Sequence, residues 1–495
     1  MWTSPYEPVP TGGTLHGLVA ETAAAVGERP ALVDGPSATV ISYAALAAQC
    51  DRAAAGLAAR GVLPGDVVAL QAPNGPQWMA LALGAMAAGA AVTGISPLAT
   101  EREVAAQLTD SGASPLVSSL TAAASTPEGL LTAPGPAPDV ASDESAVALL
   151  PYSSGTTGLP RGVMLTHRNV VAAVRQIVRA LKLTPDDTLI AVAPFAHVMG
   201  FVVSAAAALT TGAKVVSMPR FDFEAFLALV ERHRATVLIV PPPVMNALAR
   251  HPAVATRDLS SVGLVVSGGA PLGAEVQRAV GARLGAITRQ GWGLTETAAT
   301  ATASDREREV SPGSVGYAMP STQLRVVDPD SGADLGPGQP GELWVRGPQV
   351  MAGYLGRPDA TAAMIDDEGW LRTGDLGHVD ADGLVFIVDR LKELIKVSAH
   401  QVAPAELEAL LATHPAVADV AVVPRADADH GEIPVAVVVA GAAIDATDLM
   451  EWVAERVAPY KRIRDVRFAD ALPRTPAGKL VRRLIAAPEP AQAAR

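Results

Sequence analysis

The sequence predicts an α/β fold with two unequal parts: a large N-terminal domain of layered, mostly parallel sheets with helices, and a small α+β C-terminal domain. Length is the first reason, because 495 residues are too many for one ordinary core. Short β-branched runs also alternate with Ala- and Leu-rich periodic segments, as the βα units of a parallel sheet do. Finally, short strands with turn signals between Thr322 and Phe386 predict a β-rich subdomain within the larger part.

The βα units are predicted from particular runs along the chain. Segment 66–73 predicts a strand that leads into a helix near Trp78, and segment 236–242 predicts a strand before a helix over 244–251. The uncharged stretch Trp78–Ala99 is long enough to cross a bilayer, but it is rich in Ala and Gly and has no basic flanks. We therefore expect a buried helix followed by a strand there, and no membrane span.

The C-terminal part begins where the alternating pattern returns after the β-rich segment. It predicts helices over 405–414 and 448–457, with strands over 417–425 and 433–441 between them. About a hundred residues is a normal size for a small domain. We predict an N-terminal domain over 1–389, a hinge at 390–392 and a C-terminal domain over 393–495.

Charge and cysteine content exclude several classes of function. A net charge of -12 and a pI near 5.3 leave no excess of Lys and Arg to bind a phosphate backbone, so no nucleic acid partner is expected. The single cysteine, Cys50, can form no intrachain disulfide, which is typical of a reducing compartment. The N-terminus has no secretory pattern. We expect a cytoplasmic protein, and the sequence predicts no particular oligomeric state.

A loop rich in glycine and hydroxyl groups is the first candidate for a ligand site. The segment YSSGTTGLPRGVMLTH, Tyr152 to His167, could cradle phosphate with backbone N–H and hydroxyl donors. The alternative is an ordinary solvent-exposed loop. Because neither GxxxxGK[ST] nor GxGxxG is present, a bound phosphate would require another architecture.

Three further segments supply the chemistry that such a nucleotide site needs. In QGWGLTET, residues 290–297, Glu296 lies beside hydroxyls and could hold the magnesium ion that bridges ATP phosphates. In WLRTGDLGHVDADG, Asp375 lies among glycines and could accept both hydroxyls of a ribose. In PRTPAGKLVRR, Lys479 lies on a turn near the end of the chain, where a lysine is usually only solvated.

Together with PFAHVMGF, SGGAPLG, GELWVRG, GYLGRPDAT, VDRLKELIK and QVAPAELE, these motifs resemble the adenylate-forming superfamily. This superfamily includes acyl-CoA and aryl-CoA ligases, luciferases and peptide-synthetase adenylation domains. The similarity is greatest to its hydroxycinnamate-CoA ligase branch, and it covers nearly the whole chain in the same order. The resemblance implies that a small carboxylic acid is activated by ATP as acyl-AMP and transferred to CoA, with magnesium as the metal.

The resemblance also implies the nucleotide site. The loop would close over the β- and γ-phosphates, with Arg161 where the family usually has lysine. Thr295 would touch the α-phosphate, Glu296 the metal, and Lys479 both the acid and the α-phosphate. The ATP- and AMP-binding residues implied are Ser153, Ser154, Gly155, Thr156, Thr157, Gly158, Arg161, Gly268, Gly269, Ala270, Gly291, Trp292, Gly293, Leu294, Asp375, Ile387 and Arg390.

The acid pocket is implied by the same comparison. Its predicted lining is His197, Val198, Met199, Phe201, Ala298, Ala299 and Thr300, together with Gly268 and Trp292. By itself His197 would more often be a structural histidine. Its place in PFAHVMGF, however, corresponds to the residue that acts as a gate for the thiol step in the family. Relatives often have Gly-Pro-Val where this chain has Ala298-Ala299-Thr300, so the inner wall is altered and a specific hydroxycinnamate is not predicted.

The second step would require the C-terminal domain to turn about a hinge at Lys392 and present another face. That face would carry Lys396 and Gln401. The thiol tunnel would pass Ser398, Ala399 and His400. The family usually has glycine at the position of Ala399, and a methyl group there could narrow the path of the pantetheine arm.

Several functions therefore remain open. The leading hypothesis is an AMP-forming acid–thiol ligase that uses CoA. The nearest alternative keeps adenylation but uses a carrier protein or an amine as acceptor, or an unusual acid such as nitrite, as a diazotase does. AMP release that is stimulated by CoA separates these two. A luciferase-like oxygenase would emit light or consume oxygen with an acyl adenylate, and a catalytically inactive nucleotide-binding protein would show no ATP–pyrophosphate exchange with any acid.

Overall fold

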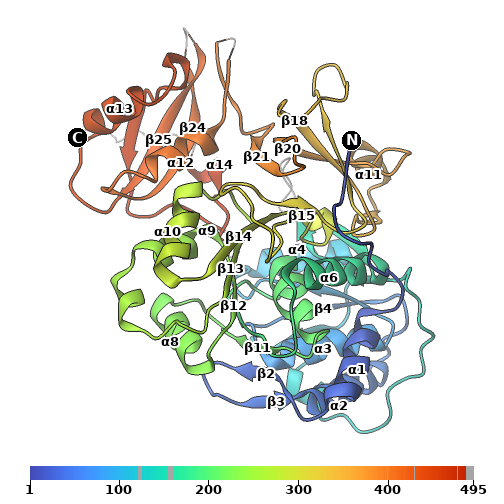
Figure 1. Cartoon of the computed structure of the whole chain (residues 1–495). Coiled ribbons are helices and arrows are strands. Elements are labelled where there is room, and N and C mark those ends of the chain that lie inside the picture. Colours follow the sequence, from blue (N-terminus) through green and yellow to red (C-terminus); the bar gives the residue numbers. More distant parts are fainter. Residues whose placement is uncertain (121–124, 154–159, 399, 428–429, 476–477, 486–495) are drawn as a thin grey trace, which may run out of the picture.

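Four sheets organise the chain in the computed structural model, which describes residues 1–120, 125–153, 160–398, 400–427, 430–475 and 478–485. Figure 1 shows the C-terminal part, in orange and red, lying on one end of a larger body made by the rest of the chain. The predicted α/β fold with a large N-terminal and a small C-terminal domain is confirmed.

The largest sheet has nine strands in the order β16-β15-β14-β13-β12-β10-β11-β2-β3. The six strands from β14 to β2 run parallel, because each is reached through a helical crossover, and the outer strands β3, β15 and β16 are antiparallel. Its strands are β2 (Pro30–Asp34), β3 (Val40–Ser42), β10 (Thr188–Ala191), β11 (Lys214–Ser217), β12 (Val237–Val240), β13 (Leu264–Ser267), β14 (Ile287–Trp292), β15 (Thr302–Ala303) and β16 (Tyr317–Ala318).

A second sheet has seven strands in the order β19-β9-β7-β5-β4-β6, with β8 paired to β9. Its strands β6, β4, β5 and β7 are parallel, whereas β8, β9 and β19 close its edge with antiparallel pairs. The strands are β4 (Val67–Gln71), β5 (Ala91–Gly94), β6 (Leu116–Ser118), β7 (Val147–Leu149), β8 (Tyr152–Ser153), β9 (Arg161–Thr166) and β19 (Gly353–Tyr354).

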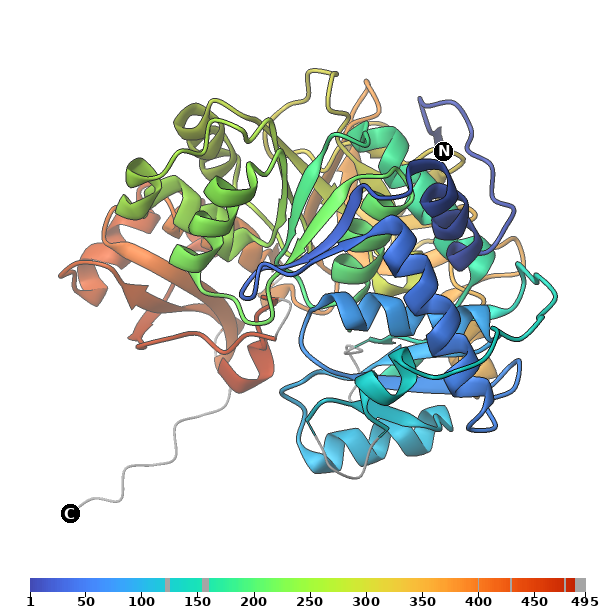
Figure 2. The same ribbon diagram turned by 90° about the horizontal axis from the view of Figure 1, so that it is seen from below.

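Helices lie between these two sheets and on the far face of the larger one (Figure 2). One core cluster joins both sheets through α1, α2, α3, α6 and η1, while a second packs α8, α9 and α10 on the nine-stranded sheet. The helices of this part are α1 (Leu15–Val26), α2 (Tyr43–Ala58), α3 (Pro76–Ala87), α4 (Glu101–Ser111), α5 (Pro127–Leu131), α6 (His167–Leu181), α7 (Ala207–Leu209), α8 (Phe223–His233), α9 (Pro242–Arg250), α10 (Ala274–Leu284), α11 (Pro358–Met364), the π-helix η1 (Met199–Ala206) and the 3-10 turns η2 (Pro252–Thr256) and η3 (Thr295–Thr297).

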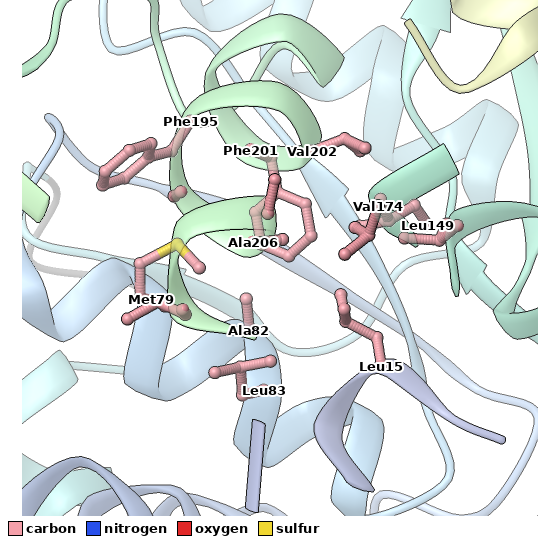
Figure 3. Close-up of a cluster of buried hydrophobic side chains, with 14 of the residues drawn as sticks. Leu15, Met79, Ala82, Leu83, Leu149, Val174, Phe195, Phe201, Val202 and Ala206 are labelled. Carbon is pink, nitrogen blue, oxygen red and sulfur yellow. The ribbon is translucent and has the colours of Figure 1, made fainter. Parts of the chain in front are cut away.

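The middle layer explains the uncharged stretch that resembles a membrane span. Residues 78–99 form most of α3 and then β5, and α3 is apolar on all sides because it is buried on all sides. Figure 3 shows Met79, Ala82 and Leu83 of α3 facing Phe201 and Ala206 of η1. The predicted buried helix and strand are confirmed. Among the described residues, no helix is long and apolar enough to span a membrane.

The predicted β-rich subdomain is a five-stranded antiparallel sheet in the order β1-β17-β18-β20-β21. The N-terminal strand β1 joins it from the far end of the sequence, which local sequence patterns do not indicate. Its strands are β1 (Trp2–Thr3), β17 (Gln323–Val327), β18 (Gly341–Arg346), β20 (Leu371–Val379) and β21 (Val385–Arg390).

The C-terminal part has its own sheet and its own core. The long hairpin β24–β25 is antiparallel, and the other edge of β25 pairs with β26, in parallel, and with β22 of the short hairpin β22–β23. Its elements are β22 (Ile395–Val397), β23 (His400–Val402), α12 (Pro404–Leu411), β24 (Val417–Asp427), β25 (Gly431–Ala440), α13 (Ala446–Ala454), η4 (Pro459–Lys461), β26 (Asp465–Phe468) and α14 (Arg482–Ile485).

Candidate active site

A cavity of about 270 Å³ lies where the two parts of the molecule meet. It opens at the carboxyl ends of the parallel strands β13 and β14, the edge where open α/β sheets bind ligands. Side chains from the β-rich subdomain and from the C-terminal part also reach it. Its lining is Ser153, Arg161, Ile177, Leu181, His197, Val198, Met199, Val203, Ile239, Val266, Ser267, Gly268, Gly269, Gly291, Trp292, Gly293, Leu294, Thr295, Glu296, Ala299, Thr300, Thr302, Ala303, Met319, Tyr354, Met364, Thr373, Arg390, Lys392 and Lys479.

Strand register brings the glycine-rich motifs together. Ser267 of β13 pairs with Gln290 of β14, so the glycines that follow each residue become neighbours at the sheet edge. A Cβ at Gly293 would lie 2.4 Å from the carbonyl oxygen of Ala299, so the chain can fold back over this strand end only without a side chain there. The result is a glycine-rich wall of the cavity against which a planar base could pack.

Behind this wall, a buried carboxylate links three of the predicted nucleotide residues. Asp375 of β20 and Arg390 of β21 are register partners, and Arg390 Nε lies 2.9 Å from Asp375 Oδ1. The other oxygen of Asp375 accepts a hydrogen bond from Trp292 Nε1 at 2.8 Å. Burial raises the pKa of Asp375, and the charge of Arg390 and the indole hydrogen bond counter part of that rise.

A second buried carboxylate, Glu296, has a partner that sequence reasoning missed. The hydroxyl of Tyr354 donates to Glu296 Oε1 at 2.8 Å, and the guanidinium of Arg161 lies 5.3 Å from the centre of the Tyr354 ring. Burial and the neighbouring Glu296 raise the pKa of Tyr354, so the hydroxyl stays protonated and keeps donating. Tyr354 belongs to the quoted motif GYLGRPDAT, which was the available signal, although the motif gave no reason to choose the tyrosine.

The C-terminal part contributes Lys479 to this cavity. Its turn is closed by two hydrogen bonds with Thr475: Thr475 N donates to Lys479 O at 2.8 Å, and Lys479 N donates to Thr475 Oγ1 at 3.1 Å. Burial lowers the pKa of Lys479, and the positive charge of Arg390 lowers it further. The charges of Glu393, Asp375 and Glu296 act in the opposite direction.

On the opposite side, His197 precedes the π-helix η1, an irregular helix type that is frequent at functional sites. Burial lowers the pKa of His197 to about 4, and the charge of Lys479 adds to this effect. The imidazole is therefore neutral at pH 7. Its Nδ1 accepts the backbone N–H of Met199 at 3.2 Å, which leaves Nε2 as the protonated nitrogen.

The remainder of the cavity is apolar. Two residues of α6, Ile177 and Leu181, line it together with Val203, and these residues come from a helix and a π-helix whose other faces are buried in the core. Ile239, Val266, Ala303 and Met319 complete this region, which we call the acid pocket.

The structure brings most of the predicted site residues to this one cavity. Those that line it are Ser153, Arg161, His197, Val198, Met199, Gly268, Gly269, Gly291, Trp292, Gly293, Leu294, Thr295, Glu296, Ala299, Thr300, Arg390, Lys392 and Lys479. Asp375 lies behind the wall, and Ala270 and Ile387 are not part of the lining. Residues 154–158 and Ala399 lie outside the described residues, so their predicted roles are not placed.

Two predicted acid-pocket residues lie in the core instead. Phe201 packs against Trp78, with ring centres 5.5 Å apart, and Ala298 is fully buried. The four remaining predictions, Lys396, Ser398, His400 and Gln401, are exposed on the β22–β23 hairpin, outside the cavity lining. The family resemblance named these positions, and it does not indicate which of them line the cavity and which lie in the core behind it.

Comparison with known proteins agrees with this geometry. The family model for AMP-binding enzymes matches residues 19–355, and the model for the C-terminal domain of these enzymes matches residues 406–479. The chain therefore belongs to the AMP-binding family of adenylate-forming enzymes. The resemblance stated from the motifs is confirmed.

Particular relatives extend along almost the whole chain. The protein is 42% identical to 4-coumarate–CoA ligase 5 of Oryza sativa subsp. japonica, over 96% of this chain and 94% of the relative. It is 38% identical to 4-coumarate–CoA ligase 2 of Nicotiana tabacum, with the same coverage.

Among solved structures, ATP-bound MatB from Rhodopseudomonas palustris superposes with a TM-score of 0.88 at 30% identity, covering 95% of this chain and 98% of that one. The apo form of the same protein superposes less well, with a TM-score of 0.77 at the same identity and coverage. The amide bond synthetase McbA from Marinactinospora thermotolerans gives a TM-score of 0.84 at 31% identity, covering 95% and 99%.

Proposed function

We propose that this protein is an AMP-forming acid–CoA ligase whose acid is a monocarboxylate with a largely apolar body. The observation that carries the proposal is the lining of the cavity, which combines Lys479, Arg390 and Glu296 with the uncharged side chains of the acid pocket. A carboxylate beside Lys479 and Arg390 would meet cations, while an apolar body would contact the aliphatic side chains of the lining. The relatives named as 4-coumarate–CoA ligases support the CoA-dependent second step.

The first step, in this proposal, joins the acid to the α-phosphate of ATP and releases pyrophosphate. Lys479 neutralises charge on the attacking carboxylate and the α-phosphate, and Thr295 touches the same phosphate. Asp375 and Arg390 hold the ribose. To bind it, Asp375 would replace part of its present contact with Trp292 or Arg390 by hydrogen bonds from the ribose hydroxyls. Arg161 and the loop after Ser153 contact the outer phosphates.

Magnesium fits this arrangement as an ion held mainly by ATP. Glu296 is the one carboxylate that lines the described cavity, and no cluster of three potential ligands exists among the described residues. Because Tyr354 occupies Oε1 only, Oε2 of Glu296 is available to the ion. Glu296 would help to hold a magnesium ion that binds with ATP, and the ion would screen the charge of the phosphates.

The second step is proposed to follow a turn of the C-terminal domain about residues 390–392, with domains over 1–389 and 393–495. It would replace Lys479 at the cavity with Lys396 and Gln401, and bring Ser398, Ala399 and His400 to the thiol path. The neutral His197 would then act as a gate. ATP and CoA are the proposed co-substrates, and the cytoplasm is the proposed compartment.

The test is ATP–pyrophosphate exchange with a panel of acids, followed by detection of the CoA thioester. We expect exchange with apolar monocarboxylates, including hydroxycinnamates, and little with dicarboxylates, because the acid pocket offers no cation to a second carboxylate. Val203→Phe should raise KM for the longer acids and leave KM for ATP unchanged, whereas Val203→Ala should favour bulkier acids. Exchange that is equally strong with dicarboxylates would contradict the proposed acid class.

An amine acceptor is the second candidate, favoured by the 31% identity to an amide bond synthetase over nearly the whole chain. Ala399, where the family usually has glycine, gives a further reason to test it. The two acceptors differ in one measurement: AMP release that CoA stimulates supports the ligase, whereas release that amines stimulate and CoA does not supports the amide synthetase.

A further inference from the structure

Helix α12 of the C-terminal part is held at both ends by side chains from before the proposed hinge. Its N-terminus lacks a cap of its own, because the N-cap residue Ala403 has no side-chain acceptor. Asp389, at the end of β21, supplies one: its Oδ2 accepts the backbone N–H of Ala405 at 2.9 Å. Asp389 is only 4% exposed, so this hydrogen bond is shielded from solvent.

The opposite end of α12 meets a cation from the large domain. Arg250, the last residue of α9, donates to the carbonyl oxygen of Ala412, and it also donates to Val417 O at 3.0 Å. A carboxylate at the N-terminus and a guanidinium at the C-terminus both complement the helix dipole. The contacts of Asp389 and Arg250 therefore both stabilise α12 in its present position.

Helix α9 extends this contact to the catalytic lysine. Its first turn lies against the loop that carries Lys479, since a Cβ at Gly478 would lie 3.3 Å from the Cβ of Pro241. Its last turn is fixed by Arg283 of α10, which donates to His251 O at 2.8 Å and to Leu248 O at 3.3 Å. Thus one helix of the large domain contacts both α12 and the Lys479 loop, as the adjacent placement of α9, α10 and α12 in Figure 1 illustrates.

We propose that Asp389 and Arg250 are positioning residues that clamp α12 in the orientation that delivers Lys479 to the cavity. A turn about residues 390–392 separates both residues from α12, so the clamp stabilises the adenylating orientation and opposes the thiol-transferring one. The effect of the clamp on the two half-reactions rests on the proposed function, whereas the clamp itself does not.

The catalytic test compares the two half-reactions in Arg250→Ala and Asp389→Ala. Loss of the contacts of either residue should slow ATP–pyrophosphate exchange about tenfold and leave thioester formation from a supplied acyl adenylate unchanged or faster. Arg175→Ala is the matched control, because Arg175 also donates to two carbonyl oxygens, of Pro10 and Gly12, but far from α12. An equal fall in both half-reactions, or none in either, would overturn the proposal.

A second test needs no substrate and separates failure of the clamp from failure of the proposed function. Hydrogen exchange is measured over residues 403–412 in the free, full-length protein. Arg250→Ala removes contacts at the C-terminal end of α12, so faster exchange of the Ala405 amide, at the other end, requires the whole helix to leave Asp389. Asp389→Asn, which keeps an acceptor oxygen, should give a smaller increase than Asp389→Ala. Unchanged exchange at Ala405 in Arg250→Ala would overturn the clamp, whatever the enzyme's activity.

Discussion

The loop that carries Lys479 and the hairpin that carries Lys396 belong to the same small domain, but they have opposite environments. Lys479 lies in the cavity, where burial lowers its pKa, whereas Lys396 is exposed on β22. Gln401 is the register partner of Lys396 on β23 and is exposed beside it. One orientation of a rigid domain can thus bring one of these lysines to the cavity, and use of the other requires the domain to turn.

The largest effect is expected from Lys479→Ala. Removing the cation that faces the reacting phosphate should slow adenylate formation at least about a hundredfold. Thioester formation from a supplied acyl adenylate should be nearly unchanged, because in the proposed mechanism this step uses the other orientation. ATP–pyrophosphate exchange and single-turnover thioester assays measure the two steps separately. Equal impairment in both assays would contradict the assignment of the Lys479 loop and the Lys396 hairpin to different steps.

Lys396→Ala is the reciprocal change, and we expect a smaller effect. Adenylate formation should be within about twofold of wild type, since Lys396 lies outside the cavity lining, while thioester formation should fall roughly tenfold. Gln401→Ala tests whether Gln401, the register partner of Lys396, also contributes to thioester formation. Unaltered overall turnover in both variants would exclude the β22–β23 hairpin from the reaction.

Sequence and structure agree best where a motif is tied to a strand end. The register of β13 with β14 and of β20 with β21 brings together residues that the motifs named separately, such as Gly268 with Gly291 and Asp375 with Arg390. The alternation of strands and helices predicted the layers for the same local reason. Those predictions needed only short-range patterns.

The positions that the sequence did not indicate depend on long-range packing. Phe201 and Ala298 have the apolar character of a cavity wall, yet they lie in the core, while Ile177 and Leu181 of α6 line the acid pocket. Helical periodicity identifies a buried face, but it does not tell which part of that face meets another layer and which part meets a cavity. Strand β1 was missed likewise, because its partner β17 is some three hundred residues away.

The pH dependence of the first step should show the burial of Lys479. A lysine carries its charge below its pKa and loses it as the pH rises through that value. Because burial lowers this pKa, kcat/KM for ATP should begin to fall at a lower pH than an exposed lysine would give. Lys479→Arg keeps its charge over this range, so any residual activity should lack that alkaline limb. If the arginine variant showed the same alkaline fall in kcat/KM, that fall would be due to another titrating group.

The smallest effect concerns the turn of the Lys396 hairpin, where Ser398 has a φ of +54° and donates its N–H to His430 O at 2.6 Å. Non-glycine residues adopt this left-handed conformation at a cost, and β-branched residues do so least readily. Ser398→Gly removes that cost but adds freedom to the unfolded chain, so the unfolding free energy should change by no more than about 0.5 kcal/mol. Ser398→Val should lower it by about 1 kcal/mol or more. Thermal unfolding of both variants measures the difference, and ATP–pyrophosphate exchange should stay at the wild-type rate in each, since Ser398 lies outside the cavity lining. A fall in exchange with Ser398→Val would show that the two regions are coupled within one orientation.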